Sequence, residues 1–175
     1  YTRSIASIEA DLSRFSEEAR LTTPTAMPDY EANEKAVAYL EKARNNLDSV
    51  GGCMECLVEG LPAGIGDPVF EKLDANLAKA VMSIGAVKSV EIGDGSLVAR
   101  RFGSENNDAF YCDEKGNVGK KTNHAGGILG GISDGSALTV RAYVKPTPSI
   151  YQTQQTINNR HENIEIQIKG RHDTS

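Results

Sequence analysis

The sequence predicts an α+β fold, a βαβ sandwich in which amphipathic helices cover a mainly antiparallel sheet. Two stretches alternate apolar and polar residues with the period of two that is typical of a strand with one buried face. They are SALTVRAYVK at 136–145 and NIEIQIKG at 163–170. Two other stretches repeat apolar residues at helical spacing. The chain has 175 residues, 39% of them hydrophobic, which is enough for one core. We therefore predict a single domain over residues 1–175.

The first clear helix is predicted after Asp29, whose carboxylate can accept hydrogen bonds from the free N–H groups of a first turn. Glu31 lies four residues before Lys35, a favourable spacing for an ion pair. The apolar stripe consists of Ala36, Val37, Leu40, Ala43 and Leu47. Upstream, we expect a strand over residues 1–8, a helix face formed by Ile8, Leu12, Phe15 and Ala19, and a loop over 21–29.

The second clear helix is predicted after Asp67, with Pro68 at the first helical position, where its missing N–H costs nothing. Its apolar face consists of Phe70, Leu73, Leu77, Ala80, Val81 and Ile84. Gly85 is expected to end it. A strand over 86–93 and a turn at Asp94-Gly95 follow. Residues 102–122 are polar and dotted with glycine, so we predict a long loop of the kind that often forms a lid or a binding segment.

The three cysteines do not form a recognisable metal or disulfide motif. Cys53 and Cys56 have C-x-x-C spacing, but they lie in GGCMECLVEG at 51–60, which is typical of a strand. Side chains three apart on a strand point to opposite faces, so one metal ion or one disulfide could not easily use both. With Cys112, they are interpreted as small buried cysteines in a reduced compartment.

Charge and hydropathy argue against two classes of partner. The net charge is −5 and both signs are mixed along the chain, whereas nonspecific nucleic-acid binders usually carry a basic face. No run of about 18 apolar residues predicts a membrane helix. The chain begins with Tyr1 without a signal-peptide pattern, and it ends directly after a strand-like stretch. We therefore expect it to be a piece of a longer protein.

The most unusual stretch is NHAGGILGGISDG at 123–135, in which five of thirteen residues are glycine. It matches neither a Walker loop nor G-x-G-x-x-G. Glycine allows sharp turns and close approach of backbone, so two interpretations stay open: close packing within the chain, or a cradle for a ligand. The neighbouring Asn123 and His124 favour the ligand.

Two further segments place charge at the ends of predicted strands. In KPTPS, at 145–149, the ammonium of Lys145 and the hydroxyls of Thr147 and Ser149 could meet a phosphate, or the segment could be an ordinary proline turn. In KGRHD, at 169–173, Arg171 could bind an anion while His172 or Asp173 moves a proton. A solvated strand end is the alternative for KGRHD.

Seven stretches in this order resemble the chorismate synthase family. They are DSVGG (48–52), GLPAGIGDPVFEKLDANLAKAVMSI (60–84), AVKSVEIG (86–93), GSENNDAF (103–110), NHAGGILGGIS (123–133), KPTPSI (145–150) and GRHD (170–173). The resemblance extends from about Pro28 to Asp173. The combination of the glycine run, KPTPS and GRHD is highly specific.

The resemblance implies an enzyme that acts in the last step of the shikimate pathway. Members of the family convert 5-enolpyruvylshikimate 3-phosphate to chorismate and phosphate by a trans elimination, and they need reduced FMN. The resemblance also implies a cytoplasmic homotetramer with a βαβ sandwich fold, in which the flavin is reduced either by the enzyme's own NADPH activity or by a separate reductase. No nucleic acid or membrane partner is expected.

The resemblance further assigns site residues. The family's FMN contacts match Gly85, Ala86, Gly130, Lys145, Pro146, Thr147, Pro148, Ser149 and Arg171. Asp173 matches an aspartate with a proposed role in proton transfer at the flavin. No metal is implied. Gly85 stands where many members have asparagine or proline, so only a backbone contact would persist there.

Parts of the family pattern are not present in these residues. Two catalytic histidines and several substrate-binding arginines belong to an N-terminal part, and a further segment follows GRHD. The isolated segment is therefore expected to be inactive. The alternative function is a phosphate-ligand binding or oligomerisation module without catalysis.

Overall fold

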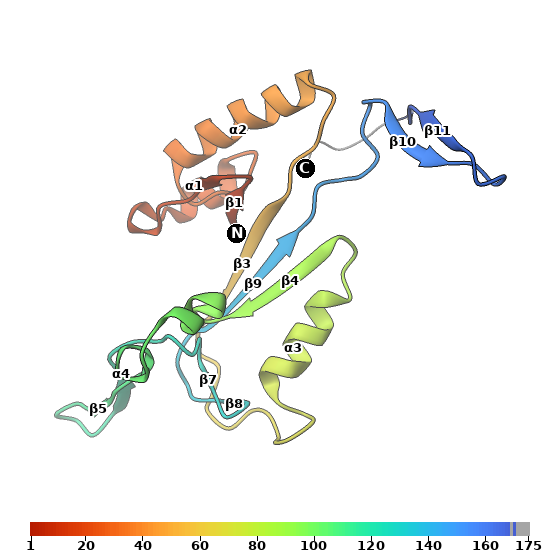
Figure 1. The fold of residues 1–175 in the computed structure, drawn as a ribbon. Helices are drawn as coiled ribbons and strands as arrows, with labels where there is room; N and C mark the ends of the chain where they lie inside the picture. The colour runs from red at the N-terminus through yellow and green to blue at the C-terminus, as the bar shows by residue number, and fades with distance from the viewer. Residues whose placement is uncertain (169, 171–175) are drawn as a thin grey trace. The chain divides into compact units, whose positions relative to one another are not determined.

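The structure, a computed structural model, describes residues 1–168 and residue 170. The chain divides into two compact units (Figure 1). The first contains residues 1–54 and the residues from 144 onward, and the second contains residues 55–143. The prediction of a single domain over residues 1–175 is not tested by this division into units and stays a prediction.

The first unit contains β1 (Thr2–Ile5), β2 (Ile8–Glu9), the 3-10 helix η1 (Leu12–Arg14), α1 (Glu17–Thr22), α2 (Tyr30–Asn45), β10 (Gln154–Ile157) and β11 (Asn163–Ile166). The second contains α3 (Leu73–Met82), β4 (Val87–Ile92), the 3-10 helix η2 (Gly95–Arg100), α4 (Gly103–Asn106), β5 (Phe110–Cys112), β6 (Val118–Lys120), β7 (Ile128–Leu129) and β8 (Ile132–Ser133). β3 (Gly52–Val58) and β9 (Leu138–Val144) continue from one unit into the other.

The main sheet has the strand order β2-β1-β3-β9-β4. β1 is antiparallel to both β2 and β3, and the small sheets β5-β6, β7-β8 and β10-β11 are antiparallel hairpins. Helices and a mainly antiparallel sheet therefore confirm the predicted α+β class.

The core of the first unit forms under α2. Asp29 caps this helix as predicted, because its carboxylate accepts a hydrogen bond from the N–H of Glu31 at 3.1 Å. The Glu31 carboxylate and the Lys35 ammonium pair at 2.5 Å. The buried cluster consists of Ile5, Ala10, Met27, Ala32 and Ala36, with Ile8, Leu40 and Val50 partly buried against it. The predicted stripe runs too far at Leu47, which lies beyond the helix and is exposed.

The helix face predicted from Ile8 to Ala19 is wrong. Two capping side chains divide this stretch: Asp11 accepts from the N–H of Ser13 and starts η1, and Ser16 accepts from the N–H of Ala19 and starts α1. Only residues 17–22 are α-helical. Residues 1–8, predicted as one strand, form β1 and the beginning of β2.

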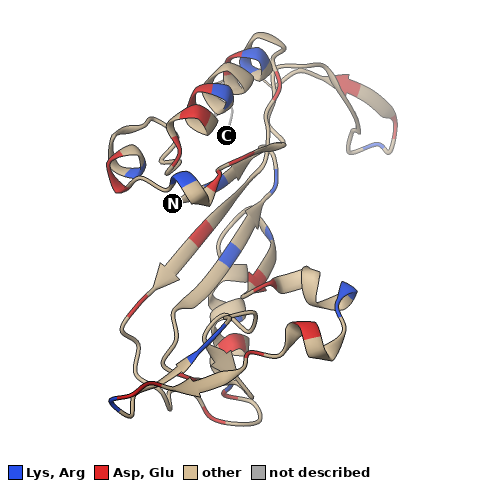
Figure 2. Cartoon of the chain, turned by 90° about the vertical axis from the view of Figure 1, so that its left-hand side faces the viewer, with Lys and Arg blue, Asp and Glu red and all other residues tan. Residues whose placement is uncertain are grey.

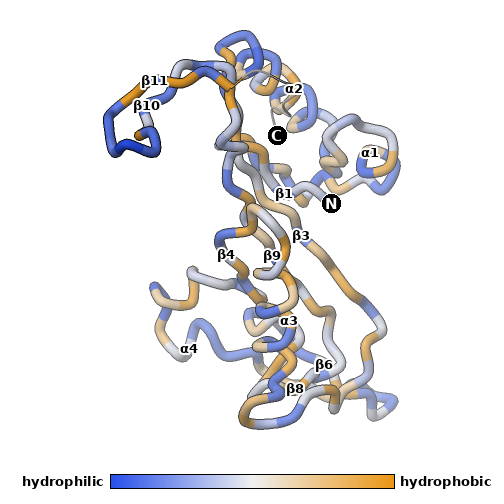
Figure 3. Tube along the Cα trace, turned by 90° about the vertical axis from the view of Figure 1, so that its right-hand side faces the viewer, coloured by the Kyte–Doolittle hydropathy of each residue, from blue (hydrophilic) through white to orange (hydrophobic). Residues whose placement is uncertain are grey.

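The strand predicted at residues 163–170 is shorter, and its isoleucine face is not buried. β11 ends at Ile166 and pairs with β10 alone in a two-stranded sheet. Ile164 is 38% exposed. The turn between its strands is hydrophilic (Figure 3).

The core of the second unit lies between α3 and the strands β4 and β9 (Figure 1). Its buried residues are Ile128, Leu138 and Val140, and Val58, Leu73, Leu77, Val81, Val90 and Ile92 are partly buried against them. The alternation predicted for β9 is confirmed at Leu138 and Val140. The strand predicted at 86–93 is confirmed as β4.

The predicted start of the second helix is wrong. The backbone N–H of Asp67 donates to the carbonyl of Glu71 at 3.0 Å, so residues 67–71 close a separate turn. α3 begins at Leu73, whose N–H donates to the carbonyl of Gly131 at 2.8 Å. Phe70 is therefore outside the helix and 90% exposed.

The long loop predicted at residues 102–122 contains α4 and the β5-β6 hairpin. The carboxylate of Asp113 accepts hydrogen bonds from the N–H groups of Lys115 and Asn117 at 2.9 and 2.8 Å. Gly116 has φ +84°. These local contacts close a tight turn and let the polar flanks pair as strands.

The cysteines are only partly as predicted. Cys53 is 3% exposed and lies in the core, while Cys56 on the same strand is exposed, as alternation requires. Cys112 is exposed in β5, so the interpretation as buried cysteines is wrong for two of the three. Both charge signs are distributed over the chain (Figure 2). Within the described residues, none of the helices has the length and apolar character needed to cross a membrane.

Candidate functional site at a glycine hairpin

The glycine run forms a tight hairpin in the second unit. β7 pairs with β8, with Leu129 opposite Ile132. Gly130 and Gly131 form the two-residue turn, with φ +60° and +87°. Positive φ at both turn positions matches the natural twist of the strands, and glycine adopts it without steric cost. The turn alone therefore favours glycine at both positions.

The glycines of the run serve two purposes. A Cβ added to Gly126 would lie 2.4 Å from Cα of Gly93, and one added to Gly127 would lie 2.7 Å from the carbonyl oxygen of Ala137. These two glycines allow backbone to pack against backbone. At Gly130, no heavy atom of the described residues, apart from Gly130 and its two chain neighbours, lies within 4 Å of the added Cβ. Gly130 therefore presents bare, exposed backbone to its surroundings.

The hairpin is attached to the loop before α3. The N–H of Ser133 donates to the carbonyl of Ile65, and its hydroxyl donates to the carbonyl of Pro62 at 2.7 Å. The same hydroxyl oxygen accepts from the N–H of Ile65 at 2.9 Å. The carbonyl of Gly131 accepts from Leu73 at the first turn of α3. The tip is thus fixed through β8 and through the turn itself.

Asn123 organises the start of the run. Its side-chain oxygen accepts from the N–H of Gly127 at 2.9 Å and from the ammonium of Lys120 at 3.0 Å. Its side-chain nitrogen donates to the carbonyl of Ala137 at 2.7 Å. Asn123, which the sequence suggested as a ligand contact, therefore uses its amide to shape the loop.

Asp108 binds the next two residues of the run. Its carboxylate accepts hydrogen bonds from the N–H groups of His124 and Ala125 at 2.8 and 3.0 Å, and from the hydroxyl of Thr122 at 2.7 Å. Burial alone would raise the pKa of Asp108. These donors and the charge of Lys120 outweigh burial and lower the pKa from 3.8 to about 2. Asp108 is therefore a carboxylate over the whole physiological range.

The imidazole of His124 is held by Asp94. Nδ1 of His124 lies 2.6 Å from Oδ2 of Asp94, and the guanidinium of Arg101 pairs closely with the same oxygen. Nδ1 also lies 2.7 Å from a guanidinium nitrogen of Arg101, so the tautomer of the imidazole decides whether Nδ1 donates to Asp94 or accepts from Arg101. Burial raises the pKa of Asp94. The contacts with His124 and Arg101 lower it by more than burial raises it, so the pKa lies below its usual value.

The sequence did not identify Asp94, Arg101 or Asp108 as site residues. Asp94 was predicted only as a turn residue, and Asp108 lay in the predicted loop. They meet the glycine run across 16 to 30 residues of chain, a distance at which no local spacing rule operates. The resemblance covered Asp108 within GSENNDAF, which was the one available signal.

Gly85 and Ala86 lie between α3 and β4 and are both exposed. Ala86 has φ +70°, a left-handed backbone conformation within the turn. Because Gly131 contacts the first turn of α3, this pair lies at the other end of the helix. Ten residues of α-helix measure about 15 Å. The structure therefore does not bring Gly85 and Ala86 into contact with Gly130.

Residues 145–149 belong to the first unit and form an irregular segment held by side-chain hydrogen bonds. The hydroxyl of Ser49 donates to the carbonyl of Thr147 at 2.7 Å, and the amide of Gln154 donates to the carbonyl of Pro148 at 2.9 Å. Lys145 is exposed at the end of β9. Pro146 packs near Gly51, where an added Cβ would lie 3.2 Å from the proline ring. Ser149 is half-buried.

The remaining predicted site residues, Arg171 and Asp173, lie outside the described residues. Gly85, Ala86 and Gly130 belong to the second unit, and Lys145 to Ser149 belong to the first. The assignment of all these residues to one cofactor site stays a prediction.

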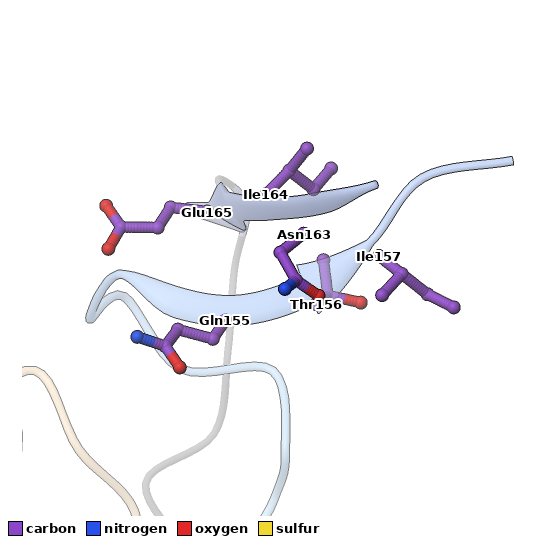
Figure 4. Close-up of a pocket in the computed structure, with 6 residues that line it drawn as sticks. All are labelled: Gln155, Thr156, Ile157, Asn163, Ile164 and Glu165. Atoms are coloured by element: carbon purple, nitrogen blue, oxygen red, sulfur yellow. The ribbon is translucent and has the colours of Figure 1, made fainter. Parts of the chain in front are cut away.

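An open hollow of about 620 Å³ lies on the β10-β11 hairpin (Figure 4). Its lining residues are Gln155, Thr156, Ile157, Asn163, Ile164 and Glu165. None of the predicted site residues is among them. In the part of the chain that the structure describes, no group of three or more metal-binding side chains is present.

Comparison with known proteins gives a consistent result. The family model described as Chorismate synthase matches residues 1–175. A chorismate synthase of Lachnoclostridium phytofermentans is 58% identical over 173 residues, covering 99% of this chain and 47% of that protein. One of Methanosarcina barkeri is 53% identical over 152 residues, covering 86% of this chain and 41% of that protein.

A solved structure described as "Crystal Structure of Chorismate Synthase" is also similar. It superimposes with a TM-score of 0.77 at 31% sequence identity, over 85% of this chain and 48% of that chain. The chain thus spans about half the length of the proteins it matches.

Proposed function

The chain belongs to the chorismate synthase family, and from this premise we propose that it forms part of an enzyme that converts 5-enolpyruvylshikimate 3-phosphate to chorismate and phosphate. One C–H bond and one C–O bond of the substrate break, one carbon–carbon double bond forms, and a proton and phosphate leave. The reaction therefore needs no net oxidation. The observation that carries the proposal is the family match along the whole chain.

The proposed cofactor is reduced FMN, which supplies electron density to the substrate while the phosphate leaves. The exposed backbone of Gly130 leaves room for a flat ring close by, because no side chain of the described residues beyond its chain neighbours stands within 4 Å of its Cβ position. Gly85 is equally open at the other end of α3, where its backbone is proposed to contact a different part of the flavin. Both features support the proposal of a flavin site.

Residues 145–149 are proposed to bind the phosphate end of the flavin. Lys145 is exposed and cationic, Thr147 and Ser149 offer hydroxyls, and two prolines stiffen the segment. Hydrogen bonds from Ser49 and Gln154 fix two of the backbone carbonyls.

Arg171 and Asp173 complete the proposed site. The guanidinium of Arg171 is proposed to hold a phosphate, and Asp173 is proposed to assist proton transfer at the flavin ring. A cytoplasmic homotetramer, with NADPH as the source of electrons or with a separate reductase, also belongs to the proposal.

Turnover by the parent enzyme, the longer protein to which these residues are proposed to belong, tests the function. We expect conversion of 5-enolpyruvylshikimate 3-phosphate only when FMN is present in reduced form. Phosphate release, followed under anaerobic conditions with reduced FMN, oxidised FMN or no flavin, measures this. Equal rates without any flavin would reject the proposal.

A further inference from the structure

A buried ionic cluster lies beneath the glycine run. The ammonium of Lys120 lies 2.6 Å from Oδ2 of Asp134 and 3.5 Å from Oδ2 of Asp108. The side chains are almost closed to solvent, with exposed fractions of 3% for Lys120, 2% for Asp108 and 8% for Asp134. One cation therefore serves two carboxylates, and backbone N–H groups together with the hydroxyl of Thr122 supply further donors.

The cluster joins both ends of the run. Asp108 binds the N–H groups of His124 and Ala125 at the start. Asp134 is part of the end of the run, and its carboxylate accepts from the N–H of Ser136 at 2.8 Å. The two ends meet again where the N–H of Asp134 donates to the carbonyl of Gly127. Between these ends lies the β7-β8 hairpin with Gly130 at its tip.

Stability alone does not explain such a cluster. Removing charges from water is costly, and apolar side chains of the same volume often stabilise a protein as well or better. Charge-assisted hydrogen bonds have strict geometry, however, and they fix the positions of the groups that they join. A run containing five glycines has little stiffness of its own, so its conformation depends on such attachments.

We propose that Asp108 is a positioning residue of the cofactor site. Through Lys120 and through the N–H groups of His124 and Ala125, it holds the glycine run in the conformation that presents Gly130 to the flavin. This inference rests on the proposed function, because the ligand at Gly130 is taken to be FMN. Asp108 acts through the loop and needs no contact with the ligand.

The effect of losing Asp108 follows from the fraction of molecules in the binding conformation. The apparent dissociation constant is the intrinsic constant divided by that fraction. Asp108→Asn removes the charge that faces Lys120, and its amide nitrogen cannot accept a hydrogen bond from a backbone N–H. We expect the loop to be in its binding conformation about a tenth of the time.

The experiment measures FMN affinity in the parent enzyme by fluorescence titration, well below the melting temperature of every variant. Asp108→Asn should raise the Kd for FMN about tenfold. The matched control is Asp113→Asn, because Asp113 also accepts backbone N–H groups in a turn of this unit but is exposed at the β5-β6 hairpin. The control should bind FMN like the wild type.

A stability effect and a positioning effect give different results in this test. Circular dichroism at the temperature of the titration verifies that each variant is folded. If Asp108→Asn is folded and binds FMN as tightly as the wild type, the inference is wrong while the proposed function stands. If the wild type itself does not bind FMN, both are wrong.

A milder variant covers the case in which Asp108→Asn does not fold. Thr122→Val removes the hydroxyl that donates to Asp108 at 2.7 Å and leaves the ionic cluster in place. It should raise the Kd for FMN by about threefold, the size of a single modest hydrogen bond. An unchanged Kd in folded Thr122→Val would overturn the inference.

Discussion

At the scale of single residues, empty space distinguishes Gly130 from the glycines around it. Gly126 and Gly127 face backbone atoms of the chain so closely that no side chain fits there. Gly130 has room for a methyl group, and only its positive φ disfavours one. Substitution at Gly130 therefore examines the surroundings of the tip without disturbing the packing below it.

Gly130→Ala should lower the free energy of unfolding by about 1 kcal/mol, because alanine is strained at positive φ. It should also weaken FMN binding, because its methyl group occupies space reserved for the ring. Gly116→Ala is the matched control, since Gly116 has φ +84° and is equally open. Urea unfolding and flavin titration of the parent enzyme measure both quantities.

The control should show the same loss of stability with unchanged FMN affinity. Equal FMN affinity in the two variants would instead assign the bare backbone at Gly130 to the hairpin turn alone. A loss of assembly with unchanged affinity would favour the oligomerisation alternative.

At the scale of elements, α2 and α3 begin by different means. Asp29 caps α2 with its own side chain, and the same carboxylate lies 3.0 Å from the guanidinium of Arg14 and 3.1 Å from the N–H of Asp11. α3 has no capping side chain at its first residue, and the carbonyl of Gly131 accepts the N–H of Leu73 instead. One helix start is therefore local, and the other depends on the tertiary fold.

Asp29→Ala should lower the free energy of unfolding by about 2 kcal/mol, at the upper end of the usual effect of an N-cap, because the buried carboxylate also holds Arg14 and Asp11. Asp67→Ala is the control, since the sequence predicted both aspartates as caps. Asp67 is exposed and caps no helix, so its loss should change stability by less than about 0.5 kcal/mol. Chemical denaturation of the two variants measures the difference, and equal losses would refute this account.

The two helix starts also explain what the sequence could predict. Asp29, Glu31 and Lys35 interact within six residues, so spacing rules describe them correctly. The start at Leu73 depends on Gly131, which is 58 residues away along the chain, and no local rule reaches that far. Beta alternation correctly predicted β9, where neighbours cover one face, but it overstated burial at Ile164.

The candidate site shows the same division between local and distant effects. The turn requirement of Gly130 and the special character of the run were visible in the sequence. The roles of Asp94 and Asp108 were not, because carboxylates that bind backbone N–H groups across a fold have no fixed spacing. Residues 102–122 were predicted as a loop for a related reason: a polar hairpin lacks the apolar alternation that marks a buried strand.

At the scale of the whole molecule, partly buried carboxylates make stability depend on pH. Burial raises the pKa values of these carboxylates, but hydrogen bonds and nearby cations lower the values by a larger amount. The pKa is therefore below its normal value at Glu91, Asp94, Asp108 and Asp134. A group whose pKa is lowered in the folded state adds stability above its unfolded pKa. That stability is lost as the pH falls through the folded value.

For Asp108, the pKa falls from 3.8 to about 2, which corresponds to about 2 kcal/mol at neutral pH. Wild-type protein should therefore lose this advantage over Asp108→Asn between about pH 4 and pH 2. Unfolding free energies of both proteins, measured from pH 6 to pH 2, check the result. A difference between them that stays constant over this interval would contradict the assignment.

The order of the two units along the chain has a consequence for biosynthesis. Residues 55–143 are continuous, whereas the first unit needs residues from both sides of them. A ribosome releases the chain from its N-terminal end, and domains generally fold as they emerge. All residues of the second unit have thus been synthesised before the first unit has its last segment, which follows Tyr143. We expect the glycine hairpin and its ionic anchor to be complete before the β10-β11 hairpin of the first unit has left the exit tunnel.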